Sequence, residues 1–130
     1  MQYNIPIYKP HIGKNETKYV NNCLESSWIS SKGQYIDKFE KMVGNFINSP
    51  YCSTTSSGTT ALHLALLALG IGENDEVITS NFTYVASTNA ILMVNAKPIF
   101  CDINRIDLNI DSDLIEKNIT NKTKAILVTN

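Results

Sequence analysis

The segment with the clearest chemical signature is a run of hydroxyl side chains around a single glycine. Residues 53–60, STTSSGTT, carry seven Ser or Thr hydroxyls, and an apolar helix is expected to follow directly. The first N–H groups of a helix have no partner inside it and carry about half a positive charge together, so they attract anions. Hydroxyls add donors, and Gly58 lets a ligand approach the backbone closely. The segment is suited to binding a phosphate group.

A plainer interpretation of the same segment competes with phosphate binding. Ser and Thr cap helices in many proteins that hold no ligand there. The segment lacks the GxxxxGK[ST] pattern of a nucleoside-triphosphate loop and, with one glycine, the GxGxxG pattern of a dinucleotide site. The residues alone therefore favour helix capping and disfavour nucleoside triphosphates and NAD.

Two amphipathic helices are expected before this segment. Apolar residues recur at helical spacing over residues 15–26 and again over 36–47. Between them, residues 26–33 form a Ser- and Gly-rich loop that contains Trp28 and shows neither helical nor strand periodicity. This loop is a candidate for ligand contact.

Strands and helices alternate along the rest of the chain. Strands are expected over residues 51–55, 76–80, 97–101 and 124–129, and helices over 60–69, 84–94 and 112–118. Such alternation is typical of parallel βαβ units, and apolar runs such as 125–128 are typical of strands covered on both faces. We predict an α/β fold with three layers and a mainly parallel sheet. Residues 1–130 are expected to form one domain whose sheet is incomplete, because the chain ends directly after a strand.

Composition narrows the classes of partner. The net charge is −1 and no run of Lys or Arg occurs, so neither nucleic acid nor an anionic membrane is an expected partner. The longest nearly apolar stretch, residues 61–69, is far shorter than the roughly 20 residues of a membrane helix. The N-terminus lacks the apolar region of a secretory signal, so a cytoplasmic location is expected. Three separated cysteines without a CxxC pair predict no metal site.

Nearly the whole chain resembles one family of enzymes. The run SSGTTALHLALLALGIGENDEVITSNFTYVASTNAILMVNAKPIFCDINRIDLNID, residues 56–111, is similar to the DegT/DnrJ/EryC1/StrS family of sugar aminotransferases, which depend on pyridoxal 5'-phosphate (PLP). Upstream, SSWISSKGQYIDKFEKMV resembles the family's Gly-Trp-Ile-Ser segment, although Ser27 stands where glycine is usual. The resemblance implies the N-terminal part of the large domain of PLP-dependent transferase fold type I, the aspartate-aminotransferase-like fold.

The resemblance also implies roles for individual residues. Ser57, Gly58 and Thr59 would bind the PLP phosphate, in agreement with the helix-terminus argument above. Tyr84 matches the family aromatic that stacks on the pyridine ring of the cofactor, although an ordinary core aromatic is the alternative. Trp28 and Ser30 match a loop near the nucleotide-sugar, although a lone Trp beside a helix often serves only for packing.

Asp102 follows the strand over residues 97–101. A parallel sheet often places ligand-binding residues at such a position, but Asp102 could equally begin a turn.

The family reaction transfers an amino group, usually from glutamate, to a keto group of a nucleotide-linked deoxysugar in amino-sugar and polysaccharide biosynthesis. It requires a lysine that binds the cofactor covalently and an acidic residue at the pyridine nitrogen. In the family both lie beyond the equivalent of Asn130, so no catalytic residue is predicted here and catalysis by this chain alone is not expected.

Two alternatives stay open. Some family members are PLP-dependent sugar dehydratases, and the chain could also be a truncated fragment without activity. The family also implies a homodimer for a full-length protein.

Overall fold

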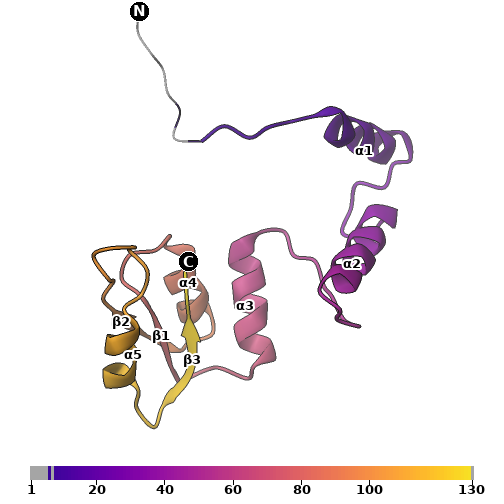
Figure 1. Ribbon diagram of the computed structural model, residues 1–130. Coiled ribbons are helices and arrows are strands. Elements are labelled where there is room, and N and C mark those ends of the chain that lie inside the picture. The colour runs from indigo at the N-terminus through magenta and orange to yellow at the C-terminus, as the bar shows by residue number, and fades with distance from the viewer. Residues whose placement is uncertain (1–5, 7, 130) are drawn as a thin grey trace, which may run out of the picture. The chain divides into compact units, whose positions relative to one another are not determined.

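The computed structural model describes residue 6 and residues 8–129. The chain divides into two units, Met1–Ser53 and Thr54–Asn130, and each is described by itself (Figure 1). The expectation that both belong to one domain stays a prediction. Among the described residues, none of the helices is long and apolar enough to cross a bilayer.

The first unit contains the two amphipathic helices that the apolar spacing predicts. They are α1, Lys14–Glu25, and α2, Gln34–Phe46. One side chain ties them together, because Asn22 Oδ1 accepts hydrogen bonds from Gln34 Nε2 and Tyr35 Oη, each at 3.0 Å. The rings of Tyr19 and Tyr35 add an aromatic contact, with their centroids 5.0 Å apart. These contacts fix how the loop between the helices begins and ends.

Ser27 in that loop has a left-handed backbone conformation, with φ of 62°. A side chain with a Cβ adopts this region with difficulty, whereas glycine adopts it freely. The usual glycine of the family at this position therefore has a conformational reason, and this chain departs from the pattern at an energetic cost.

The second unit is a parallel α/β unit, as the alternating pattern predicts. Its strands are β1, Glu76–Ser80, β2, Lys97–Cys101, and β3, Thr123–Leu127. Its helices are α3, Gly58–Ala68, α4, Ala86–Met93, and α5, Ser112–Asn118. The three strands form one sheet in the order β2-β1-β3, with both pairs parallel. The first strand in the sequence thus lies at the centre, and β1 is buried at every residue.

Helices cover both faces of this sheet. The main core joins α3 and α4 to one face through Leu66, Val77 and Ile91, with Leu127 of β3 packed against it. On the other face, Cys101 Sγ lies 3.6 Å from the carbonyl oxygen of Asp111, which caps α5. Right-handed crossovers explain this arrangement, because the chain moves from β1 outward to β2 and then back across β1 to β3.

Gly70 ends α3 in a left-handed conformation. Its φ is 70°, and the N–H groups of Gly70 and Ile71 donate to the carbonyls of Leu67 and Leu66. This pairing satisfies the last carbonyls of the helix and turns the chain toward β1.

Two predictions about elements are wrong. Residues 51–55 form no strand, because no other strand of the described residues pairs with that segment. Tyr51 within it is 86% exposed. The helix expected from Tyr84 begins at Ala86 instead, so Tyr84 lies in the preceding loop.

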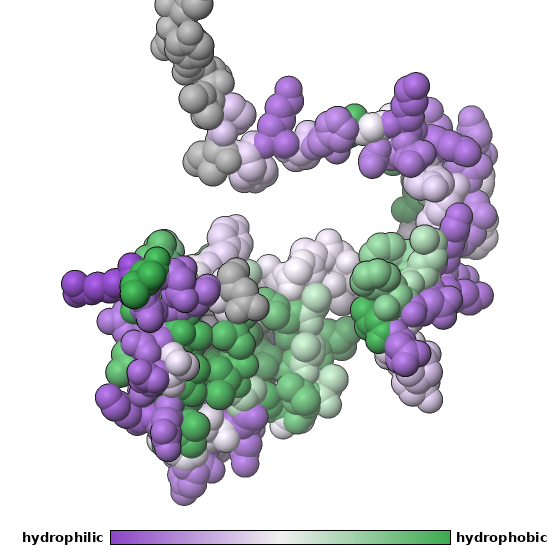
Figure 2. Space-filling model, in the orientation of Figure 1, coloured by the Kyte–Doolittle hydropathy of each residue, from purple (hydrophilic) through white to green (hydrophobic). Residues whose placement is uncertain are grey.

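The apolar helix α3 is also less buried than its composition predicts. Leu66 is buried, but Leu64 and Leu67 are 45% and 52% exposed, because α3 packs through one side only. Likewise Ile126 of β3 is 42% exposed, so this strand is not covered on both faces. Figure 2 shows the resulting apolar surface over α3 and β3.

Candidate functional site

The N-terminus of α3 is closed by its own hydroxyl side chains. Ser57 is the N-cap, and its Oγ accepts the N–H of Thr60 at 3.3 Å. Thr60 Oγ1 in turn accepts the N–H of Ser57 at 3.1 Å and donates to the Ser57 carbonyl at 2.8 Å. The expected capping role of these residues is therefore real, and it fixes the direction in which the first turn points.

Capping leaves two backbone donors at this terminus unengaged. Within the described residues, no hydrogen bond uses the N–H of Gly58 or Thr59, whereas those of Thr60 and Ala61 are both engaged by Ser57. A Cβ built on Gly58 would meet no atom within 4 Å, so the space beside the Cα of this residue is open. Two free donors at a positive helix terminus beside open space are a fit for one phosphate group.

The same unit places this terminus at the ligand-binding edge of the sheet. Because α3 ends where β1 begins, the helix runs opposite to the strand and starts near the strand's carboxyl end (Figure 1). The loop that carries Tyr84 leaves β1 at that edge. In parallel α/β sheets, ligands bind at the carboxyl edge, where neighbouring loops leave toward opposite faces. The loops after β1 and β2 diverge in this way, toward α4 and α5.

A pocket of about 550 Å³ lies between these diverging loops. Tyr84 lines it and is 80% exposed, which is far from the core aromatic that was the alternative. The other lining residues come from the ends of all three strand–loop segments: Phe82, Thr83, Asp107, Leu108, Asn109 and Thr129. An open aromatic ring at the carboxyl edge can accept a flat ligand on its face.

Asp102 is engaged by the protein at this edge. Its Oδ1 accepts hydrogen bonds from the backbone N–H of Ile103 at 2.8 Å and from Asn81 Nδ2 at 3.0 Å. These two bonds and the nearby Arg105 hold the pKa of the Asp102 carboxyl below its usual range. Asp102 thus braces the loop after β1, and the turn that follows begins at Asn104 rather than at Asp102. One carboxylate oxygen of Asp102 is therefore already engaged by the protein.

Trp28 and Ser30 belong to the first unit. Both line one pocket of about 230 Å³ in the loop between α1 and α2. Trp28 is 58% exposed, so it is not a buried packing anchor in this unit, and Ser30 Oγ donates to the Lys32 carbonyl at 3.3 Å. The two residues share this pocket, and their contact with a substrate stays a prediction.

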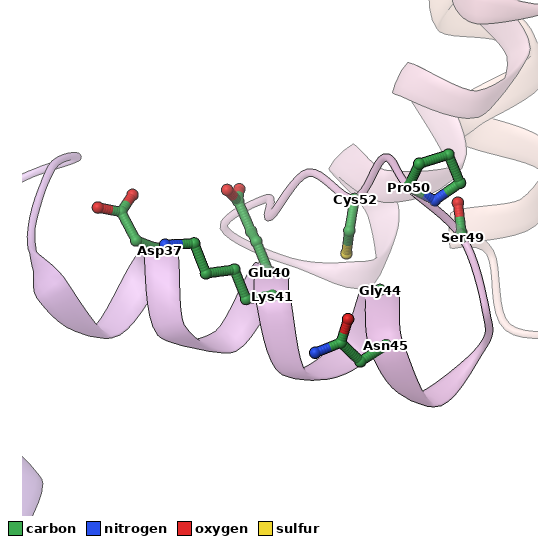
Figure 3. Close-up of a pocket in the computed structure, with 8 residues that line it drawn as sticks. All are labelled: Asp37, Glu40, Lys41, Gly44, Asn45, Ser49, Pro50 and Cys52. Atoms are coloured by element: carbon green, nitrogen blue, oxygen red, sulfur yellow. The ribbon is translucent and has the colours of Figure 1, made fainter.

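A further hollow of the first unit contains none of the predicted site residues. Figure 3 shows it between α2 and the segment from Ser49 to Cys52, with Gly44 at its floor. A Cβ on Gly44 would lie 2.9 Å from the carbonyl oxygen of Ser49, so the glycine is needed for this close approach. Across the described residues, no three His, Cys, Asp or Glu side chains gather to hold a metal.

Comparison with known proteins settles the family. The sequence profile of the DegT/DnrJ/EryC1/StrS aminotransferase family matches residues 10–130. This chain belongs to that family. The resemblance drawn from the sequence and the α/β fold with its parallel sheet are thereby confirmed.

Relatives within the family include enzymes with named activities. The GDP-perosamine synthase of Escherichia coli O157:H7 is 53% identical over 127 residues, which are 98% of this chain and 35% of that protein. Spr1654 of Streptococcus pneumoniae in its PMP form, assigned as a sugar aminotransferase, superposes with a TM-score of 0.88 at 37% identity over 97% of this chain and 32% of its own. The chain thus spans about a third of the length of these relatives.

A family member of a different activity has the same local fold. A GDP-4-keto-6-deoxymannose-3-dehydratase holding a trapped PLP-glutamate geminal diamine superposes with a TM-score of 0.83 at 27% identity, over 96% of this chain and 34% of its own. The fold of this segment therefore does not distinguish amino transfer from dehydration.

Sequence reasoning missed the residues that hold the Tyr84 loop. Thr83 Oγ1 lies 2.8 Å from Thr129 Oγ1, 46 positions away, and Asn81 reaches Asp102, 21 positions away. Parallel pairing of β1 with β2 and with β3 is the signal that could have found these pairs, since it brings the residues after each strand to one edge.

Proposed function

We propose that this chain forms the cofactor-phosphate end of a PLP-dependent aminotransferase that acts on a nucleotide-linked keto-deoxysugar. The observation that carries the proposal is the pair of unengaged N–H groups of Gly58 and Thr59 beside open space. PLP and PMP each carry one phosphate, and solved relatives are named in complex with these groups. When bound, PLP supplies the electron sink that amino-group transfer requires.

Each predicted residue has a defined task in this proposal. The Gly58 and Thr59 N–H groups donate to the phosphate, and the Thr59 hydroxyl adds a donor. Ser57 orients the first turn through its cap, and its own hydroxyl proton faces either Thr60 Oγ1 at 3.2 Å or the anion. Tyr84 offers its exposed ring to the pyridine ring. Trp28 and Ser30 contact the nucleotide-sugar.

The substrate is proposed from the named relatives. The synthase at 53% identity makes GDP-perosamine and the dehydratase acts on GDP-4-keto-6-deoxymannose, so we infer a GDP-linked keto-deoxysugar as the acceptor. Glutamate is the proposed amino donor. We also propose that the protein is a homodimer and is located in the cytoplasm. Light scattering tests the dimer, because it measures the mass of the particle in solution.

Sugar dehydration is the second candidate, favoured by the shared fold of the dehydratase. The identity of 53% with an amino-sugar synthase against 27% with the dehydratase favours amino transfer. Incubation with PLP, glutamate and GDP-4-keto-6-deoxymannose separates the two by mass spectrometry, because only amino transfer places nitrogen in the nucleotide-sugar. Loss of a hydroxyl without gain of nitrogen would identify the dehydratase.

Removal of a single backbone donor tests the phosphate site without disturbing the helix. Gly58→Pro deletes one N–H at the first helical position, where proline is well tolerated, and Ser57 before it is already extended, with φ of −163° and ψ of 165°. We expect the thermal midpoint to be retained and the PLP affinity, measured by absorbance titration, to fall by about 10-fold or more, as for one hydrogen bond to a charged group.

Gly58→Ala is the matched control, because it adds a Cβ in open space but keeps the N–H. It should lose much less affinity than Gly58→Pro. Pyridoxal, which lacks the phosphate, should bind both variants equally. Equal PLP affinities of the two variants would contradict the assignment of this turn as the phosphate site. If the unaltered protein did not bind PLP, the remaining interpretation would be a fragment without activity.

A further inference from the structure

The loop that carries Tyr84 is anchored on both sides by side chains at the carboxyl ends of the neighbouring strands. On the β2 side, Asn81 donates its N–H to the Cys101 carbonyl at 3.0 Å and its Nδ2 to Asp102 Oδ1 at 3.0 Å. On the β3 side, Thr83 Oγ1 lies 2.8 Å from Thr129 Oγ1. Two pairs of side chains thus hold this loop. Phe82 and Tyr84 are the aromatic residues of the loop that line the pocket.

The anchors also join the loop to the core beneath it. Thr83 Oγ1 lies 3.1 Å from the hydroxyl of Ser87, a buried residue in the first turn of α4. The hydroxyl of buried Ser80 accepts the N–H of Phe82 at 3.1 Å. Asp102 is itself fixed by the N–H of Ile103. The Asn81 and Thr83 side of each pair is therefore supported by a strand or a helix, Cys101 of β2 and Ser87 of α4.

Tyr84 by contrast is not held by its own side chain. It is 80% exposed, and within the described residues its hydroxyl makes no hydrogen bond. The place from which its side chain extends over the pocket is then set by the backbone of residues 81–85. A ring that stacks on a flat ligand is effective only if it already points the right way, because ordering it on binding would cost conformational entropy.

We propose that the Asn81–Asp102 and Thr83–Thr129 pairs are positioning residues that hold Tyr84 in its ligand-stacking orientation. The proposal rests on the proposed function of Tyr84 as the platform for PLP. It predicts that four side chains contribute to the affinity for the ligand, those of Asn81, Thr83, Asp102 and Thr129. Only the two threonines among them line the pocket.

Loss of either pair is measured as PLP affinity in two backgrounds. In the otherwise unaltered protein, Asp102→Ala and Thr129→Val should each weaken PLP binding by about 2- to 10-fold, as expected for one hydrogen bond. In a Tyr84→Ala background the same changes should have no further effect, because the group that they position is gone. Asp102→Asn and Thr129→Ser keep an acceptor and a hydroxyl, and each should restore most of the affinity.

Thr123→Val is the matched control. It removes a hydrogen bond of 2.9 Å, from the Thr120 N–H to Thr123 Oγ1, at the opposite end of β3. Its stability should fall like that of Thr129→Val, whereas its PLP affinity should stay unchanged. Amide hydrogen exchange without PLP should show faster exchange over residues 81–85 in the anchor variants only.

Three results overturn the proposal: an unchanged PLP affinity in the anchor variants, an equal loss in the Tyr84→Ala background, or an equal loss with Thr123→Val. A failure of the proposed function is distinguishable, because the unaltered protein would then not bind PLP at all while the exchange measurement would still report on the anchors.

Discussion

Ser27 holds the loop between α1 and α2 in a conformation that its Cβ disfavours. Its φ of 62° lies in the left-handed region, where a residue other than glycine pays roughly 1–2 kcal/mol. Nothing in the described hydrogen bonds of the Ser27 side chain offsets this cost, although its backbone N–H donates to the Leu24 carbonyl at 3.2 Å. Other interactions within the first unit must therefore offset this conformational energy.

Replacing this residue by glycine should stabilise the protein. Part of the gain is lost because glycine gives the unfolded chain more freedom, so we expect Ser27→Gly to raise the free energy of unfolding by roughly 0.5–1 kcal/mol, measured by urea denaturation. Ser26→Gly is the control, since Ser26 has an ordinary φ of −82° and its hydroxyl donates to the Cys23 carbonyl. That variant should be destabilised, and a Ser27→Gly variant less stable than the unaltered protein would contradict the argument.

At the scale of elements, α3 presents two different faces although its sequence is apolar nearly all round. Leu66 is 4% exposed and packs in the core with Val77 and Ile91, whereas Leu67 is 52% exposed. Neighbouring leucines should therefore differ widely in their contribution to stability.

Alanine substitution measures this difference directly. Leu66→Ala should lower the free energy of unfolding by about 2–5 kcal/mol, because it leaves a cavity in the core. Leu67→Ala should change it by less than about 1 kcal/mol, as an exposed position does. Urea denaturation of the two variants gives both values, and equal losses would mean that α3 is buried on both faces.

The elements also show what the sequence could and could not reveal. The strands over residues 76–80 and 97–101 and the helix over 112–118 were predictable to the residue, because turn and cap signals bound each of them. Residues 51–55 have a strand-like composition, but no strand of the described residues pairs with them. The sequence of one segment does not reveal whether a neighbouring strand will be present.

The site divides in the same way between local and distant signals. The turn at residues 57–59 was predictable, because helix starts follow local rules. The bonds from Asn81 to Asp102 and from Thr83 to Thr129 were not, because they depend on which strands become neighbours. The left-handed φ of Ser27 was equally hidden, since only the departure from the family's glycine pointed to it.

At the scale of the second unit as a whole, one carboxylate ties the starts of all three strands. Glu76 at the start of β1 accepts a hydrogen bond of 2.6 Å from Thr120 Oγ1, before β3, and one of 3.3 Å from Lys97 Nζ of β2. The Thr120 hydroxyl is the main cause that lowers the pKa of Glu76, and Lys97 and Lys122 lower it further. The carboxylate form is thus favoured by folding.

This shift predicts a pH dependence of stability. Because the folded pKa lies below the ordinary Glu value of about 4.3, the stabilisation is present above that value and is lost as the pH falls through the folded pKa. The difference in urea midpoint between the unaltered protein and Glu76→Gln should be largest at neutral pH and shrink below about pH 4. Thr120→Val should raise the pKa of Glu76 in an NMR titration. An unchanged pKa would contradict the hydrogen bond from Thr120 as the main cause of the shift.

The strand order has a consequence for how the protein is made. Strands β1 and β2 are joined by one short helix, whereas the chain must return from β2 across β1 before β3 can pair with β1, so the contacts of β3 are separated by far more chain. During synthesis the β1–α4–β2 portion can assemble before β3 has left the ribosome. The bond between Asn81 and Asp102 then forms early, and the one between Thr83 and Thr129 forms last. The loop that carries Tyr84 is thereby anchored on both sides only after β3 has docked.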